Sequence, residues 1–278
     1  MTDPIETTTS GKLEVSSDKA RMAATALLAC MTVLASCAIR QRAATPSTTE
    51  LEKMYERAIR ESAVRRPDWN VPLWSFGDAQ ILSVSTFTED STLDTASQYV
   101  WVAPTAQMRQ MCKGKSDSVL SLQQILGLPP QKNPQPGNRW KVITFDVARE
   151  AVFRPCPGGL ETASNNNPRC SAGNSLDPHL DRETAYFLLN QYWMAHHTAI
   201  VGDGKTDLGY PWTGMGWTFN WDPNSKTHVG VSEFVVRKSA IPSNVYAVTP
   251  AAFCSAEPPV TGLLRSPGTG VSAANTGR

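Results

Sequence analysis

Residues 139–147 read RWKVITFDV, a run in which apolar and polar side chains alternate. This period of two predicts a β-strand with one face buried. Two earlier runs, 79–87 (AQILSVSTF) and 98–103 (QYVWVA), are rich in β-branched and aromatic residues and are bounded by polar turns. We expect both to be strands as well, so the first half of the chain supplies three strands for a sheet.

A β-hairpin is predicted further along the chain. The segments 209–221 and 228–237 both alternate, and the residues between them, 222–226, read DPNSK. Asp, Pro, Asn and Ser are typical turn residues, so the two runs should pair antiparallel. The complete set of strands predicts a mixed or antiparallel sheet.

Helices are indicated by spacing and by capping residues. Apolar residues recur at helical intervals over 50–64, and Thr49 with Glu52 matches a capping box. A second helix is expected over 116–126, capped by Ser116 or Asp117 and followed by a glycine. Pro104 is expected to open a short helix that runs to Met111.

The strongest helical pattern covers residues 181–199 (DRETAYFLLNQYWMAHHTA). Its apolar and aromatic side chains span a wide arc, so we expect this helix to be well buried. The arc comprises Ala185, Tyr186, Leu188, Leu189, Tyr192, Trp193, His196 and His197. Together with the strands, this pattern predicts an α+β fold: a single disulfide-stabilised domain with an antiparallel or mixed sheet and a buried aromatic-rich helix.

Four cysteines, Cys112, Cys156, Cys170 and Cys254, lie in the part of the chain expected to fold. Four cysteines allow three connectivities, and the sequence cannot choose among them. The polar loop from Cys156 to Cys170 makes that pairing the simplest, with Cys112 to Cys254 as its complement. Closing a loop of that size stabilises by ~3 kcal/mol in the chain-entropy model. Such bonds persist in oxidising compartments, so export is expected.

Residues 22–39 form an uncharged run after Lys19 and Arg21, and the run contains Leu34-Ala35-Ser36-Cys37. This tetrad resembles a bacterial lipobox. The resemblance implies a lipoprotein precursor that is cut before Cys37, whose thiol carries a fatty acid such as palmitate. Leu27-Leu28-Ala29-Cys30 is a poorer second candidate, and an uncleaved membrane anchor or a buried helix are the alternatives.

The resemblance to a lipobox also implies a domain organisation and a cellular location. Residues 1–36 would be the signal sequence, 37–48 a flexible tether, 49–255 an α+β periplasmic domain and 256–278 a disordered tail. Ala38 after the lipidated cysteine implies sorting to the outer membrane, on its periplasmic face. No family resemblance is evident for the exported domain itself.

Composition excludes some functions. The chain has 278 residues, of which 41% are hydrophobic and 18% charged, and its formal net charge is +1. This length is enough for one or two domains with a real core. Nucleic-acid binders usually carry a strongly basic stripe, and none is present here, so no nucleic-acid partner is expected.

A row of aromatic residues is the candidate ligand surface. Trp217, Phe219 and Trp221 alternate, so all three project from one face of a strand, and Trp212 lies just upstream. An exposed row of this kind can stack on sugar rings, and peptidoglycan is the glycan at hand in the periplasm. Large aromatics more commonly form core, and that alternative is the favoured one.

Candidate catalytic groups are sparse. All four histidines, His179, His196, His197 and His228, lie in one region of the chain, which suggests a metal-dependent hydrolase as a third hypothesis. His196 and His197 are adjacent and point about 100 degrees apart on a helix, unlike the pair of a zinc-protease helix. Glu233 is a lone carboxylate in a predicted strand, where it is expected to be solvated or paired. No metal and no other cofactor is predicted.

Two main functions follow from the sequence. The first is a membrane-anchored periplasmic lipoprotein, without catalysis, that binds an envelope protein partner as an assembly component or as an inhibitor of an effector. The alternative is a peptidoglycan-binding protein or hydrolase that uses the aromatic hairpin, with Glu233 or Asp222 as acid or base. An enzymatic role is the less favoured of the two.

Overall fold

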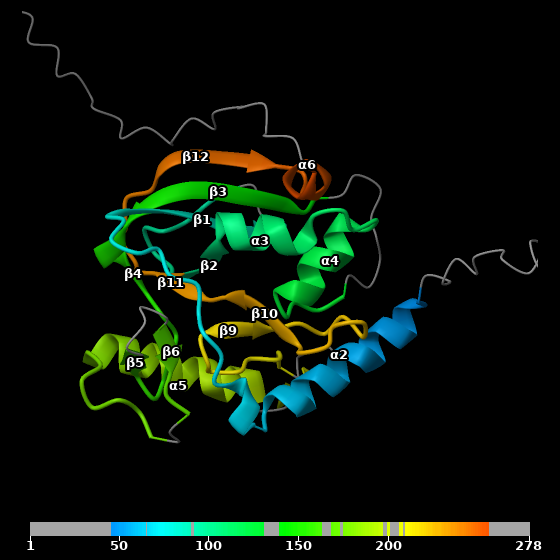
Figure 1. Ribbon diagram of the computed structural model, residues 1–278, viewed down its shortest axis with the longest axis horizontal. Helices are drawn as coiled ribbons and strands as arrows, with labels where there is room; N and C mark the ends of the chain where they lie inside the picture. The colour runs from blue at the N-terminus through cyan, green and yellow to red at the C-terminus, as the bar shows by residue number, and fades with distance from the viewer. Residues whose placement is uncertain are drawn as a thin grey trace, which may run out of the picture. The chain divides into compact units, whose positions relative to one another are not determined.

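The alternating runs form a six-stranded antiparallel sheet in the computed structural model, which describes residues 46–64, 66–89, 92–130, 139–162, 168–172, 175–196, 199–200, 206–207 and 209–255 (Figure 1). The strand order is β12-β3-β1-β2-β11-β4. Strands β1 (Ile81–Thr88) and β3 (Lys141–Ala148) pair along their whole length. The three predicted strands are confirmed, and so is the α+β class.

The remaining strands of this sheet are shorter. Strand β2 (Val100–Pro104) pairs with β1 and with β11 (Phe234–Val236), and β11 pairs in turn with β4 (Val152–Phe153). Strand β12 (Ser243–Val248) adds to the free edge of β3. Each of these pairings is antiparallel, which settles the alternative between a mixed and an antiparallel sheet.

Three helices pack against one face of the sheet: α3 (Thr105–Cys112), α4 (Ser118–Ile125) and α6 (Pro250–Cys254). Asp117 caps α4 by accepting a hydrogen bond from the Leu120 amide at 2.9 Å, as one of the two predicted caps. Helix α6 was not predicted. A disulfide between Cys112 and Cys254, with a Cα–Cα distance of 5.3 Å, joins the ends of α3 and α6.

A second layer is built on the predicted hairpin. Strands β9 (Trp217–Phe219) and β10 (Val229–Ser232) pair antiparallel, so the hairpin is confirmed in a shorter form. Helix α2 (Thr48–Ser62) and the 3-10 helix η1 (Pro67–Trp69) contribute residues to the core cluster that also holds the hairpin aromatics. A second 3-10 helix, η2 (Arg149–Ala151), links β3 to β4.

The N-terminus of α2 differs from the prediction. Ser47, not Thr49, is the cap: its hydroxyl accepts from the Glu50 amide, while the Glu50 carboxylate accepts from the Ser47 amide at 2.7 Å. Ser47-Thr-Thr-Glu50 satisfies the same motif two residues earlier, and the earlier start adds helical hydrogen bonds. Ser47 and Thr48, the last residues of the predicted tether, are therefore the cap and the first residue of the helix.

Helix α5 (Arg182–His196) is the largest departure from the sequence prediction. Asp181 caps it by accepting from the Thr184 amide at 2.8 Å. Leu188 and Ala195 are fully buried, whereas most of the large side chains on the helix are at least half exposed. The expectation that this aromatic-rich helix is well buried is wrong, because the helix lies at the edge of the molecule with one face on the domain (Figure 1).

The Pro- and Asn-rich segment after Cys156 contains more structure than expected. The Cys156–Cys170 disulfide is present, with a Cα–Cα distance of 5.3 Å, so both favoured pairings are confirmed. Within the loop it closes, β5 (Leu160–Thr162) pairs with β6 (Pro168–Cys170). A small pair, β7 (Ala199–Ile200) and β8 (Thr206–Asp207), follows α5.

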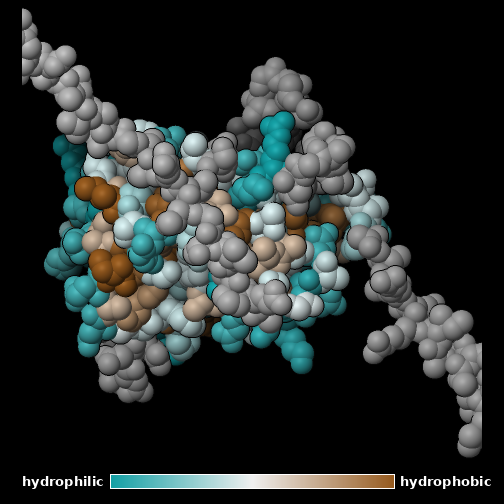
Figure 2. Space-filling view, turned by 90° about the horizontal axis from the view of Figure 1, so that it is seen from above, coloured by the Kyte–Doolittle hydropathy of each residue, from teal (hydrophilic) through white to brown (hydrophobic). Residues whose placement is uncertain are grey.

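Several predictions lie outside the described residues: the lipobox with Cys37, most of the tether, Gly202 as a helix stop, and the tail from residue 256. Among the residues that are described, no helix is long and apolar enough to cross a membrane. The side that carries β12 and α6, seen from above in Figure 2, mixes hydrophobic and hydrophilic residues. Helix α5 lies on the opposite side of the domain in the view of Figure 1.

Candidate functional site

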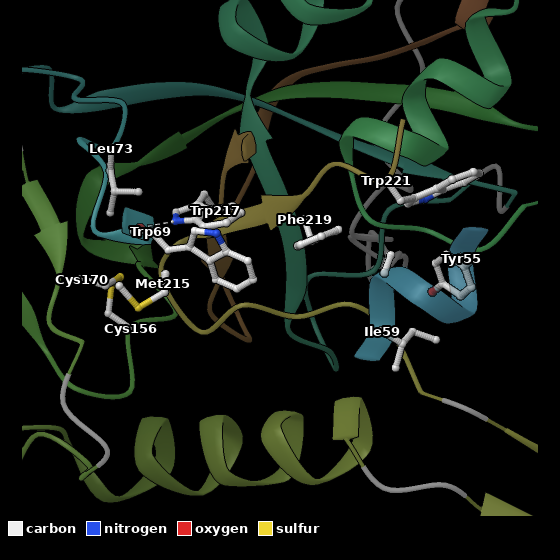
Figure 3. Packing of buried hydrophobic residues seen from close by; sticks show 11 residues of the cluster. Tyr55, Ile59, Trp69, Leu73, Cys156, Cys170, Met215, Trp217, Phe219 and Trp221 are labelled. Carbon is white, nitrogen blue, oxygen red and sulfur yellow. Dashed lines mark hydrogen bonds between the residues drawn. A yellow bond between two sulfur atoms is a disulfide. The ribbon is translucent and has the colours of Figure 1, made fainter. Parts of the chain in front are cut away.

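The aromatic row of the hairpin forms core, not a binding surface (Figure 3). Trp217 and Phe219 are 1% exposed and Trp221 is 3% exposed. Trp69 packs edge-on against both Trp217 and Phe219, with ring centroids 5.4 and 5.7 Å apart. Trp212, in a neighbouring cluster, is also buried. The favoured interpretation of these four rings as core is therefore correct, and the less favoured one, an exposed row that stacks on a ligand, is wrong.

Hydrogen bonds reinforce this burial. The Trp217 indole donates to the Trp69 carbonyl at 3.2 Å, and the Trp221 indole donates to the Leu128 carbonyl at 2.9 Å. Helix α2 supplies Tyr55, whose ring lies edge-on to Trp221 at 5.8 Å. Alternation along the strand predicted that these side chains share a face, but it did not predict that α2 and η1 would cover that face.

The described histidines, His179, His196 and His228, do not converge on a metal site. Within the described ranges, no group of three or more His, Cys, Asp or Glu side chains is placed to hold a metal ion. His228 contacts the Asn220 carbonyl through Nδ1 at 2.9 Å and stacks on Phe219, whereas His196 packs against Tyr192. His197 lies outside the described residues. The geometry thus offers no support for the metal-dependent hydrolase.

The two carboxylates considered for acid–base catalysis are not brought together. Asp222 lies in the turn after β9, where it pairs with Lys115 at 3.3 Å. Glu233 lies between β10 and β11 and lines a cavity to which Asp222 does not contribute. A glycosidase needs two carboxyl groups across one sugar bond, so this pair does not form such a site.

Glu233 is in an unusual environment for a carboxyl group. The residue is 7% exposed, and its Oε2 atom has no hydrogen-bond partner among the residues that the structure describes. Burial raises the pKa of Glu233 to about 8, and the side chain of Trp212 acts in the opposite direction. The expectation of a solvated strand carboxylate is wrong, because the side chain is buried. The carboxyl group is instead mainly protonated at neutral pH.

The cavity beside Glu233 has a volume of about 280 Å³ and mostly apolar walls. Its walls come from β1, β2, the turn that follows α4, helix α5 and the hairpin. The Trp212 indole lies close enough to Glu233 to lower its pKa as a hydrogen-bond donor, although its Nε1 atom, like Glu233 Oε2, makes no hydrogen bond of normal geometry within the described residues. Two other polar groups near Glu233 have partners. The Tyr210 hydroxyl donates to Gln191 Oε1 at 2.6 Å, and the Thr218 hydroxyl donates to the Ile125 carbonyl. Burial raises the pKa of Tyr210, and the charge of Glu233 raises it further once that carboxyl group has ionised, so the Tyr210 hydroxyl stays a donor.

The outer side of α5 is a second candidate site, which we call the α5 face. It consists of Tyr186, Leu189, Tyr192, Trp193 and Met194, each between 50% and 61% exposed. The guanidinium of Arg182 lies 5.5 Å from the Tyr186 ring centroid. Large apolar patches are uncommon on the surface of monomers and often mark interaction sites. The same helix supplies Gln191 to the cavity, so α5 separates the two candidate sites.

The sequence contained signals for both sites. Glu233 is flanked by Val231-Ser232 and Phe234-Val235-Val236, and a lone acid within so apolar a run indicates a buried carboxyl group. In α5, the apolar side chains span more of the helix surface than a single buried face covers, so some of them are exposed to solvent. Comparison with known proteins adds nothing to these indications: no protein-family model, no curated protein and no solved structure matches the chain.

Proposed function

We propose that this protein is a membrane-anchored, periplasmic lipoprotein that binds an envelope protein through the α5 face. The observation that carries the proposal is the exposure of two tyrosines, a tryptophan, a leucine and a methionine on one helix. Tyr, Trp and Met are enriched at protein interfaces, and buried Trp and Tyr side chains contribute most of the binding energy there. The two disulfides support an oxidising compartment.

A protein partner fits the α5 face better than a lipid surface does. Helices that lie in membrane interfaces are rich in Lys and Arg on their polar side. Between Arg182 and His196 the only Lys or Arg residue is Arg182 itself, and Glu183 offsets its charge. The partner we propose has an apolar patch for Leu189 and Trp193, with an acidic group at its edge for Arg182.

The glycan-binding alternative requires a different platform from the one first considered. Exposed rings are found on α5, where Tyr186, Tyr192 and Trp193 could stack on sugar rings. A row of rings on a helix does not form the flat, continuous surface that a glycan strand needs, so protein binding is the better assignment. Pelleting with purified peptidoglycan separates the two.

The experiment places a photo-crosslinking amino acid at position 193 and, as the control, at position 241. Ile241 is 89% exposed but lies outside the α5 face. We expect one discrete protein adduct from position 193 in intact envelopes and none from position 241. The partner is then identified, purified and titrated against the parent chain, Trp193→Ser and Ile241→Ser.

The titration decides the proposal. We expect Trp193→Ser to weaken binding at least about tenfold and Ile241→Ser to leave binding unchanged. An adduct at twice the chain mass would indicate a second copy, and co-pelleting with peptidoglycan that Trp193→Ser abolishes would favour the glycan. Either result, or equal affinity for both variants, contradicts the proposal.

The anchor is tested separately. Cells grown with labelled palmitate should incorporate label into the parent chain and not into Cys37→Ser, which should also keep residues 1–36 because the cut requires an acylated cysteine. Cys30→Ser is the matched control, since its thiol lies in the poorer second candidate site. Label that survives Cys37→Ser would contradict anchoring at this residue.

A further inference from the structure

The cavity beside Glu233 has no role in the proposed binding through the α5 face. It lies on the inner side of α5, between the six-stranded sheet and the β9–β10 hairpin, and its walls include Phe87, Ala103 and Val231. The space of about 280 Å³ is a pocket that is partly open to solvent, not a void within the close-packed interior. A space of this size is either filled by a molecule or by several waters.

Most polar groups in the walls of the cavity have hydrogen-bond partners, and one carboxyl oxygen does not. Ser85 contacts the Thr105 and Thr144 hydroxyls at 3.0 and 2.8 Å. Thr218 also accepts from the Val231 amide at 2.9 Å. Among the described wall residues, Glu233 Oε2 is the carboxyl oxygen that lacks a partner, and a buried polar group without one costs ~1–3 kcal/mol. A ligand with a complementary group would remove this cost.

The walls also indicate the charge of the ligand. No Lys, Arg or His side chain among the described residues lines the cavity, so an anionic ligand would meet the carboxyl group without a counter-charge. A cationic ligand would form an ion pair away from water, whose desolvation commonly exceeds the attraction. A neutral carboxylic acid in apolar surroundings is instead a hydrogen-bond donor, so it requires an acceptor.

We propose that this cavity binds a small, uncharged and mainly apolar molecule whose single acceptor, such as a carbonyl oxygen, takes a hydrogen bond from Glu233. An apolar cavity of about 150 Å³ holds benzene, so the present volume suits a molecule of about ten to twelve non-hydrogen atoms. Thr86, Trp101, Leu128, Gln191 and Tyr210 line the cavity and are partly exposed, so they mark the way in.

The test uses three probes of nearly equal size: 4-phenyl-2-butanone, n-butylbenzene and the 4-phenylbutylammonium ion. Each is titrated into the purified domain at pH 6, where Glu233 is protonated, and binding is followed by protein-detected NMR. We expect the ketone to bind five- to tenfold tighter than the hydrocarbon, since a net hydrogen bond of about 1 kcal/mol corresponds to that ratio. The ammonium probe should bind more weakly than the ketone.

Three variants assign the effect to the cavity and to the carboxyl group. Glu233→Gln keeps a donor of similar shape and should retain the preference for the ketone. Glu233→Leu removes the donor, so ketone and hydrocarbon should bind within about twofold of each other. Ala103→Leu fills the space from a buried wall position and should weaken all probes at least about tenfold, with an otherwise unchanged amide spectrum.

Each other outcome overturns a stated part of the proposal. Absence of saturable binding by any probe, with ordered waters in the cavity of a high-resolution structure, shows that it is a hydration site. Equal affinity for ketone and hydrocarbon in the parent chain removes the role of Glu233. Tightest binding of the ammonium ion replaces the uncharged ligand with a cation. None of these results bears on the α5 face, which the probes do not touch.

Discussion

The buried carboxyl group of Glu233 makes folding sensitive to pH between about 5 and 8. Its pKa is raised to about 8 in the folded chain, against about 4.3 for an unperturbed glutamate. Between these values the folded state binds more protons than the unfolded state, so stability falls as pH rises through this window. The contribution is on the order of a few kcal/mol, complete at pH 4 and lost by pH 9.

The matched variant for this prediction is Glu233→Gln, which is neutral at every pH. Urea unfolding of the parent chain should show a steady loss of stability from pH 5 to pH 8, and the variant should lack that loss. The pKa values of Glu50, Asp94 and Asp181 are lowered by hydrogen bonds, so their effect lies at acid pH and is common to both proteins. Parallel curves for the two proteins would show that Glu233 ionises normally.

Gly216 is a second position where one residue controls packing. It has a φ of +72°, and a Cβ there would lie 2.7 Å from Cys170 Sγ and 2.9 Å from Leu73 Cδ1. Gly216→Ala should therefore cost both backbone strain and overpacking, or about 2–4 kcal/mol in total. Gly77→Ala is the control for strain alone, since its φ is +57° and nothing lies within 4 Å of the added Cβ.

Chemical denaturation of both glycine variants separates the two effects. We expect Gly77→Ala to cost about 1 kcal/mol and Gly216→Ala clearly more. If the two variants lose the same stability, the contact with the disulfide is not as tight as described.

For single residues of the hairpin, the sequence predicted which side chains share a face but not which residues cover that face. Trp217, Phe219 and Trp221 do belong to one core cluster, although β9 ends at Phe219 and only the first two lie in the strand. Their burial depends on Tyr55 and Trp69, which lie some 150 residues earlier in the chain. A local pattern carries no information about such distant partners.

Among the elements, α2 tests where a helix begins. Ser47 makes both hydrogen bonds of the capping box with Glu50, whereas Thr49 lies within the first turn of the helix. Ser47→Ala should destabilise the chain by about 0.5–2 kcal/mol. Thr49→Ala should have almost no effect, since alanine favours the helix interior. If Thr49→Ala lowers the unfolding temperature more than Ser47→Ala does, Thr49 is the cap, as the sequence suggested.

Helix α5 offers a pair of adjacent leucines in opposite environments. Leu188 is fully buried and Leu189 is 50% exposed. Leu188→Ala should cost about 2–5 kcal/mol, while Leu189→Ala should change the stability of the isolated chain by less than about 0.5 kcal/mol. Similar losses for both would mean that the α5 face is covered by the chain itself, which would remove the basis of the proposed partner site.

The sequence predicted the elements better than their surroundings. Strands β1, β2 and β3, the hairpin, α2, α3, α4 and α5 were all expected, because their periodicity and caps are local. Strand β12 and helix α6 were not, since Asn244 at a φ of 50° interrupts the strand and α6 has five residues. The burial of α5 was misjudged because a wide apolar arc is typical both of a buried helix and of one with a binding face.

For the whole molecule, the disulfides fix how the layers are held. Cys112–Cys254 joins positions 142 residues apart, and Cys156–Cys170 joins positions 14 apart. In the chain-entropy model these closures stabilise by about 5 and 3 kcal/mol respectively. The sequence favoured these two pairings, since the short loop leaves a single complement, but the convergence of α3 and α6 on one bond depends on the fold.

The central claim is an exported, lipid-anchored and oxidised chain, and intact mass spectrometry of the protein extracted from membranes tests it directly. We expect a polypeptide that begins at Cys37, carries the added mass of fatty acyl groups on that residue and lacks four thiol hydrogens. A chain that retains residues 1–36, with no acyl mass and all cysteines reduced, would contradict the account.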